Sequence, residues 1–217
     1  MGAGLDDSAR RRFDLTMLHA VHGAFRRDMT VMELAGRLAA GGPFMADAGP
    51  FPVDANAWTL FRFHWLAQRA AERRALWSVL RGRVSGGRSA ALEAMDVQAV
   101  RLVALMDRVD AALEHEDDDV LVLLARKLPA ALDAHLDFKE AHVLPLIHEA
   151  LTPYEWGTYE VEFRREIGVR GLRVFLPWLL DGASDRTCAA VLRLLPPPVR
   201  LAYRTRWLPR YRRSLRH

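Results

Sequence analysis

Apolar residues recur at every third or fourth position along most of this chain, which is the period of amphipathic α-helices. Alternation of the strand type is nearly absent. The pattern predicts helices over about residues 14–38, 56–80, 89–113 and 119–149, with a loop rich in Gly and Pro from Gly41 to Pro52. Pro129 and Pro145 should kink or end parts of the fourth helix. Four helices with short links predict an all-α, up-down four-helix bundle.

The last third of the chain has a different pattern. Thr152-Pro153-Tyr154-Glu155 has the form of a capping box with proline at the first helical position, so a new helix should begin there. Gly168, Gly171 and Gly182 then divide the chain into shorter helical stretches. We therefore expect a bundle over 1–150 and a helical extension over 151–217 that packs on it. The expected packing face of the extension is Leu172, Phe175, Leu176, Trp178 and Leu179.

Each of the four apolar seams carries polar residues near its middle. These residues are His22, then Gln68 and Glu72, then Asp96, then His135, Lys139 and His142. A buried charge costs several kcal/mol unless it is paired or bound to a metal. Four helices with polar groups at similar depth therefore predict one shared site.

Large apolar side chains flank these polar positions and should line a pocket beside them. They are Phe25, Met29, Phe61 and Trp65, and Gln68 and His142 would contribute polar contacts to a bound ligand. Apolar walls with a few convergent polar groups are typical of small-molecule sites. In such a site Glu72 or Asp96 could act as a base, His22 or His135 as a proton donor, and Lys139 as an electrostatic stabiliser.

Three segments resemble the hemerythrin-like (HHE cation-binding) family over about residues 13–150. They are Ala20-Val21-His22 with Arg26-Arg27-Asp28-Met29, Glu72 with Leu76-Trp77-Ser78-Val79-Leu80, and His135-Leu136 with Glu140 and Leu144-Pro145-Leu146-Ile147. The resemblance implies a four-helix bundle around two iron ions. It also implies ligands from all four helices, of which His22, Glu72 and His135 match the expected residue types.

The remaining implied ligand positions depart from the family pattern. Gln68 stands where the resemblance implies a His, Asp96 where it implies another His, and Lys139 where it implies an acid. Glu140 or His142 could substitute if the register were shifted. An ammonium group is not a normal iron ligand, so we expect Lys139 to supply positive charge in place of a metal and the site to hold no cofactor. The alternative is an altered iron site made of His22, Glu72, Asp96 and His135.

Composition limits the class of protein. The 217 residues carry a net charge of +4 and a single cysteine, Cys188, which excludes an internal disulfide. The chain has no apolar run long enough to span a membrane and no apolar signal segment, so we expect a cytoplasmic protein. No acid follows Asp185, and arginines are frequent there, but no nucleic-acid motif accompanies them. Tyr203, Trp207 and Tyr211 should pack inward while the arginines face water.

Three functions follow as hypotheses. The first is a cofactor-independent enzyme or binding protein that performs acid–base chemistry, such as cyclisation, isomerisation or elimination, on a small molecule. The second is an iron protein that handles oxygen, nitric oxide or peroxide, as the resemblance implies. The third is a structural or interaction protein whose polar cluster is a buried salt-bridge network, with the basic tail as its contact surface.

Overall fold

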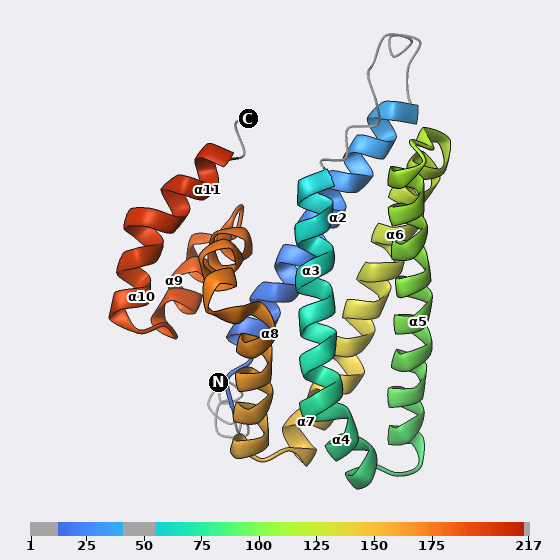
Figure 1. The fold of residues 1–217 in the computed structure, drawn as a ribbon. Helices are drawn as coiled ribbons and strands as arrows, with labels where there is room; N and C mark the ends of the chain where they lie inside the picture. Colours follow the sequence, from blue (N-terminus) through green and yellow to red (C-terminus); the bar gives the residue numbers. More distant parts are fainter. Residues whose placement is uncertain (1–12, 41–54, 215–217) are drawn as a thin grey trace, which may run out of the picture. The chain divides into compact units, whose positions relative to one another are not determined.

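The computed structural model describes residues 13–40 and 55–214, and every regular element in these ranges is helical (Figure 1). The first two thirds contain α2 (Thr16–Ala40), α3 (Ala55–Glu72), the π-helix η2 (Arg73–Trp77), α4 (Ser78–Arg83), α5 (Gly87–Glu114), α6 (Asp118–Phe138), the π-helix η3 (Lys139–Val143) and α7 (Leu144–Ala150). The last third contains α8 (Pro153–Leu180), α9 (Asp185–Arg193), α10 (Pro197–Ala202), the π-helix η4 (Tyr203–Trp207) and α11 (Leu208–Ser214). The prediction of an all-α protein is confirmed, whereas the predicted loop at Gly41–Pro52 lies outside the described residues. No helix in the described ranges is long and apolar enough to cross a membrane.

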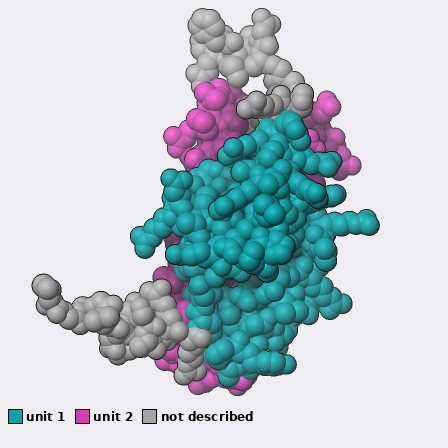
Figure 2. Space-filling view, turned by 90° about the vertical axis from the view of Figure 1, so that its left-hand side faces the viewer, with its two compact units in different colours: residues 1–24, 66–79, 151–217 teal, residues 25–65, 80–150 magenta. Residues whose placement is uncertain are grey.

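The chain divides into two compact units, coloured separately in Figure 2. Unit 1 comprises residues 1–24, 66–79 and 151–217, and unit 2 comprises residues 25–65 and 80–150. The expected boundary after residue 150 coincides with a boundary between the units. However, the expected extension forms a unit together with residues 1–24 and 66–79, which the sequence assigns to the bundle.

Unit 2 contains α5 and α6, which lie side by side and are joined by a short turn (Figure 1). Its α3 segment contacts α5 through Trp58, whose Nε1 donates to Asp110 at 2.7 Å, and through Arg62, whose Nε lies 2.9 Å from an Asp110 carboxylate oxygen. Phe25 of α2 packs edge-on against Phe61 and Trp65 of α3. Aromatic packing and polar pairs along the helices thus hold this unit together.

In unit 1, α8 packs against η2, η4 and α11. The predicted capping box is confirmed at its start, since Glu155 N donates to Thr152 Oγ1 at 3.3 Å and Thr152 N donates to Glu155 Oε2 at 2.8 Å. Residues Phe175, Leu176, Trp178 and Leu179 of the expected packing face are buried. The helix bends at Gly168, where φ is 73° and ψ is 157°, a backbone conformation that glycine adopts without a steric penalty.

The prolines of the fourth predicted helix act differently from one another. Pro129 was expected to kink or end the helix, but α6 continues through Pro129 to Phe138 without an interruption. Pro145 follows η3, in which Leu144 N donates to Lys139 O across a wider turn. A proline cannot donate to the carbonyl one turn earlier, and a π-helical turn is one way to accommodate the missing bond.

Candidate functional site

Three of the predicted site residues form a buried polar cluster in unit 1. His22 comes from α2, and Gln68 and Glu72 come from one face of α3; all three are at most 3% exposed. Gln68 Nε2 donates to Glu72 Oε1 at 2.9 Å and lies 3.4 Å from His22 Nε2. The helical i, i+4 spacing of Gln68 and Glu72 brings their side chains together. The amide therefore joins an imidazole to a carboxylate inside the unit.

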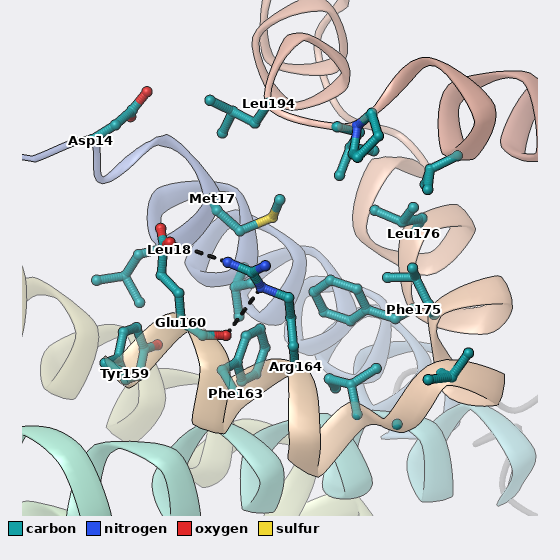
Figure 3. A pocket seen from close by; sticks show the side chains of 18 of the residues that line it. Asp14, Met17, Leu18, Tyr159, Glu160, Phe163, Arg164, Phe175, Leu176 and Leu194 are labelled. Carbon is teal, nitrogen blue, oxygen red and sulfur yellow. Dashed lines mark hydrogen bonds and ion pairs between the residues drawn. The ribbon is translucent and has the colours of Figure 1, made fainter. Parts of the chain in front are cut away.

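Unit 1 also contains an apolar cavity of about 490 Å³ (Figure 3). Its walls come from the start of α2, from both halves of α8 and from the connection between α9 and α10. The large lining side chains are Met17, Leu18, Val21, Trp156, Tyr159, Phe163, Ile167, Leu172, Phe175, Leu176, Leu194 and Leu195. This volume falls within the range of small-molecule pockets.

The polar groups of the pocket are few and lie on its open side. Arg164 donates from Nη2 to Glu160 Oε2 at 3.3 Å and from Nε to the Glu160 carbonyl at 3.2 Å, and Figure 3 draws this pair against Met17 and Phe163. The two side chains are 70% and 40% exposed, so water reaches them. Asp14 also lines the pocket. A guanidinium and carboxylates at the opening provide both donors and acceptors.

Tyr159 lines the pocket, and its phenol group interacts electrostatically with Glu72 of the buried cluster. Burial raises the pKa of the Tyr159 phenol well above 10.0, and the charges of Glu72 and Glu160 raise it further. The phenol therefore stays protonated across the physiological range and can donate a hydrogen bond. Trp156, one turn earlier in α8, is 4% exposed, and its indole Nε1 has no hydrogen-bond partner among the described residues.

The other buried residues of the predicted site belong to unit 2. His135 of α6 and Lys139 of η3 are 4% and 2% exposed, and the His135 ring meets Trp65 edge-on with centroids 5.7 Å apart. Phe25, Met29 and Phe61 are buried in the same unit. The predicted apolar side chains are thus core residues of unit 2, whereas the cavity in unit 1 has different walls.

Two predicted site residues are not buried, and the sequence analysis was wrong about their depth. Asp96 is half exposed and forms an ion pair with Arg81 of α4. His142 is exposed, with its ring tilted against Phe138 at 4.7 Å between centroids. Both positions satisfy the apolar spacing of their seam, but the widened turn of η3 shifts the register at His142, and α5 turns Asp96 to solvent.

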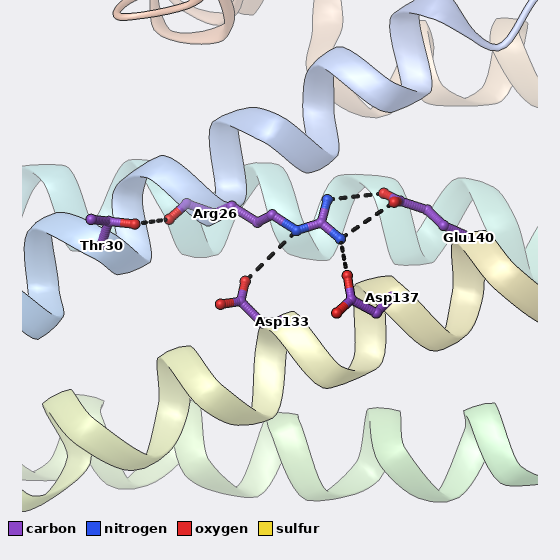
Figure 4. Close-up of polar contacts among 5 residues, drawn as sticks. All are labelled: Arg26, Thr30, Asp133, Asp137 and Glu140. Carbon is purple, nitrogen blue, oxygen red and sulfur yellow. Dashed lines mark hydrogen bonds and ion pairs between the residues drawn. The ribbon is translucent and has the colours of Figure 1, made fainter.

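Glu140, the other possible substitute ligand, has an arginine partner. Arg26 of α2 lies among three acids in unit 2, with Nη1 2.9 Å from Glu140 Oε1, Nη2 2.7 Å from Asp137 Oδ1 and Nε 3.7 Å from Asp133 Oδ1 (Figure 4). Burial raises the pKa of the Asp133 carboxyl, while the Arg26 charge lowers it in part. The cluster explains why an arginine follows His22 by one turn of the helix.

The residues at the implied ligand positions do not fit a two-iron centre. Gln68 directs its amide N–H to Glu72, Asp96 is half exposed and paired with Arg81, and the buried Lys139 carries an amine in place of an acid. Iron centres of this kind need carboxylate and imidazole donors at those places. We derive no chemistry from iron in this chain.

The pocket in unit 1 was not predicted from the sequence. A signal was present, since Trp156, Tyr159 and Phe163 follow one another at helical spacing after the capping box. This stripe is not distinguishable by period from an ordinary packing face, and its partner residues Met17, Leu18 and Val21 lie more than a hundred positions earlier. No protein-family model, no curated protein and no solved structure matches this chain.

Proposed function

We propose that this protein binds a small, mostly apolar molecule in the pocket of unit 1 and performs proton-transfer chemistry on it. The observation that carries the proposal is the cavity of about 490 Å³ with aromatic and aliphatic walls. An empty apolar cavity destabilises a protein, and a ligand that fills it without binding the unfolded chain adds stability. Such a cavity supports a binding role better than a structural one.

The polar groups narrow the class of ligand. At the open side, Arg164 and Glu160 largely neutralise one another and the Asp14 carboxylate accepts a hydrogen bond from Thr16 N, so these groups favour no strongly charged ligand. Trp156 also lines the pocket, and because its buried Nε1 has no hydrogen-bond partner among the described residues, we propose it as the donor to a ligand oxygen. We therefore assign the site to an uncharged molecule with an apolar body and a hydroxyl or carbonyl group.

The chemistry would come from Tyr159 with the His22–Gln68–Glu72 cluster behind it. Tyr159 would donate a hydrogen bond to the ligand at the pocket wall, and Glu72 would be the buried base, oriented by its hydrogen bond from Gln68. Groups with separated proton affinities beside an apolar site suit isomerisation, cyclisation or elimination. In unit 2, His135 and Lys139 stay predicted site residues of a hemerythrin-like bundle remodelled to work without metal.

Binding is tested with the uncharged fluorescent probe N-phenyl-1-naphthylamine. Trp156 lines the pocket, so we expect bound probe to quench tryptophan emission and to gain fluorescence. Leu172→Trp should fill the pocket and abolish the signal, whereas Leu123→Trp, at a site 43% exposed on α6, should leave it unchanged. A wild-type protein that binds no probe, or two variants that bind equally well, would contradict the proposal.

The chemistry is tested separately, with a panel of apolar ketones in deuterated water. We expect proton exchange next to the carbonyl, followed by NMR, and loss of that exchange in Glu72→Gln and Tyr159→Phe with probe binding retained. Unchanged exchange in both variants would remove these residues from the mechanism. Metal analysis of the same sample checks the iron alternative, since stoichiometric iron in active protein would favour it.

A further inference from the structure

The last helices of unit 1 carry an unusual concentration of positive charge. After Asp185 the sequence contains nine arginines and no acid. Seven of these arginines are exposed in α9 to α11, and none of the seven is ion-paired with a described residue: Arg186, Arg193, Arg204, Arg206, Arg210, Arg212 and Arg213. Their positive charge is therefore available to a partner. We call this set the arginine surface.

Exposed apolar side chains accompany the arginine surface. Leu194, which follows α9, is 45% exposed, and Leu201 of α10 is 63% exposed. Leu194 also lines the pocket, as does Val169, which is 94% exposed beside the bend of α8. The rim of the pocket is thus apolar at Leu194, which directly follows Arg193 of the arginine surface. Unpartnered apolar side chains next to basic ones are typical of surfaces that lie on membranes.

We propose that the arginine surface docks the protein on an anionic membrane and that the pocket takes its apolar ligand from there. The second clause rests on the proposed function. Arginine binds phosphate groups in a bidentate manner, and clustered arginines are attracted to anionic headgroups. Leu194, Leu201 and Val169 would enter the boundary between headgroups and acyl chains. An uncharged apolar molecule dissolves in that layer, so its path into the cavity would avoid water.

The aromatic residues of this region favour a membrane over a nucleic acid. Tyr203 is buried, and Trp207 and Tyr211 are half-buried, so none of the three offers a free ring face for stacking on bases. The exposed side chains on α9 to α11 include leucine together with arginine. Exposed leucine side chains can be buried among lipid acyl chains, which is favourable. A sugar–phosphate backbone offers no apolar environment in which to bury them.

The test is sedimentation with phosphatidylcholine vesicles that contain or lack phosphatidylglycerol. We expect binding only to the anionic vesicles, weakened by salt. The variant Arg206→Ser/Arg210→Ser/Arg213→Ser should bind them about a hundredfold more weakly, since each basic residue near the surface contributes about fivefold. The matched control Arg101→Ser/Arg108→Ser/Arg126→Ser removes the same charge from exposed positions of α5 and α6 and should bind like the wild type.

Other outcomes separate this proposal from the previous one. Leu201→Ser should weaken vesicle binding without changing probe binding in solution, because Leu201 does not line the pocket. Leu172→Trp should lose the probe but still sediment with vesicles, so failure of the pocket leaves the docking surface testable. Equal loss of vesicle binding in both triple variants would show that binding depends on net charge alone, and it would overturn the proposal. Tighter binding to duplex DNA than to anionic vesicles, lost in the first triple variant, would assign the surface to nucleic acid instead.

Discussion

Gln68 has contacts that no apolar side chain of the same size could replace. Its amide Nε2 donates to Glu72 Oε1 at 2.9 Å and lies 3.4 Å from His22 Nε2, in a part of unit 1 where all three residues are buried. A carboxylate that loses a donor in such a place keeps the cost of its lost hydration. Gln68 thus allows an acid to sit in the apolar seam of α3.

We expect Gln68→Met, which keeps the shape of the side chain, to lower the free energy of unfolding by about 1–3 kcal/mol. Gln98→Met on α5 serves as the control, because Gln98 is only half-buried, and its effect should stay within about 0.5 kcal/mol. Urea unfolding followed by circular dichroism measures both. Equal effects of the two changes would mean that the Gln68–Glu72 bond contributes nothing specific.

Protonation of the buried His64 ring affects the stability of the fold. It is 1% exposed, and burial lowers the pKa of its imidazole from 6.5 to about 3. Below pH 6.5 the unfolded chain binds a proton that the folded chain refuses, so stability falls as the pH falls toward 3. At about pH 5 the expected loss from this group is about 2 kcal/mol relative to neutral pH.

His64→Gln removes the titrating group, so its free energy of unfolding should depend less steeply on pH between pH 7 and pH 5 than that of the wild type. The difference between the two profiles should be about 2 kcal/mol at the acidic end. Chemical denaturation at a series of pH values gives both profiles. Parallel profiles would show that His64 takes up its proton equally well in the folded protein.

At the scale of elements, glycines mark where helices approach one another and where they bend. A Cβ added at Gly36 of α2 would lie 2.5 Å from the Cβ of Ala125 in α6, whereas one added at Gly23 of the same helix would meet nothing within 4 Å. Gly36→Ala should therefore destabilise the protein by about 1–3 kcal/mol, because the helices of unit 2 must move apart. Gly23→Ala should stabilise it by about 0.5–1 kcal/mol through helix propensity. Melting temperatures compare them, and a gain in both variants would contradict the close approach.

The bend of α8 has a functional consequence because Gly168 lines the pocket with φ at 73°. An alanine there would be strained, by about 1–3 kcal/mol, and relief of that strain would straighten the helix and displace the pocket wall. We expect Gly168→Ala to weaken the free energy of probe binding by at least as much as it lowers the free energy of unfolding. Gly157→Ala is the control, since its added Cβ meets nothing within 4 Å in the same helix. Full probe affinity in Gly168→Ala would show that the bend is not needed for the site.

The sequence predicted most elements because their signals are local. The capping box at Thr152 and the helical period before it are properties of a few neighbouring residues, and both are confirmed. Asp96 lies in the regular helix α5 next to the buried Met95, so the buried face of that helix passes beside it. The register error at His142 has a local cause that the helical period does not reveal. A π-helical turn adds a residue to the helix at η3, so positions beyond Lys139 rotate away from the face that a regular α-helix would give them.

At the scale of the whole molecule, the candidate site could be predicted only in part. His22, Gln68 and Glu72 come together because a polar residue on an apolar helical face must find polar partners when it is buried. The pocket could not be predicted in the same way, because apolar residues that line a cavity and those that fill a core have the same spacing. The pocket lies where α8 bends at Gly168, with Leu18 of α2 and Phe175 of α8 among its lining residues.

The two units share helices, and this leads to a prediction about unfolding. The boundaries at residues 24, 65 and 79 fall inside α2, α3 and α4, so each of these helices has residues in both units. A helix gains its stability cooperatively along its length, and loss of one part weakens the hydrogen bonds of the rest. We expect a single calorimetric transition, with equal calorimetric and van't Hoff enthalpies, despite two compact units. Leu172→Trp, which fills the pocket of unit 1, should shift the whole transition rather than part of it. Two resolved transitions, of which only one moves in that variant, would mean that the units unfold independently within their shared helices.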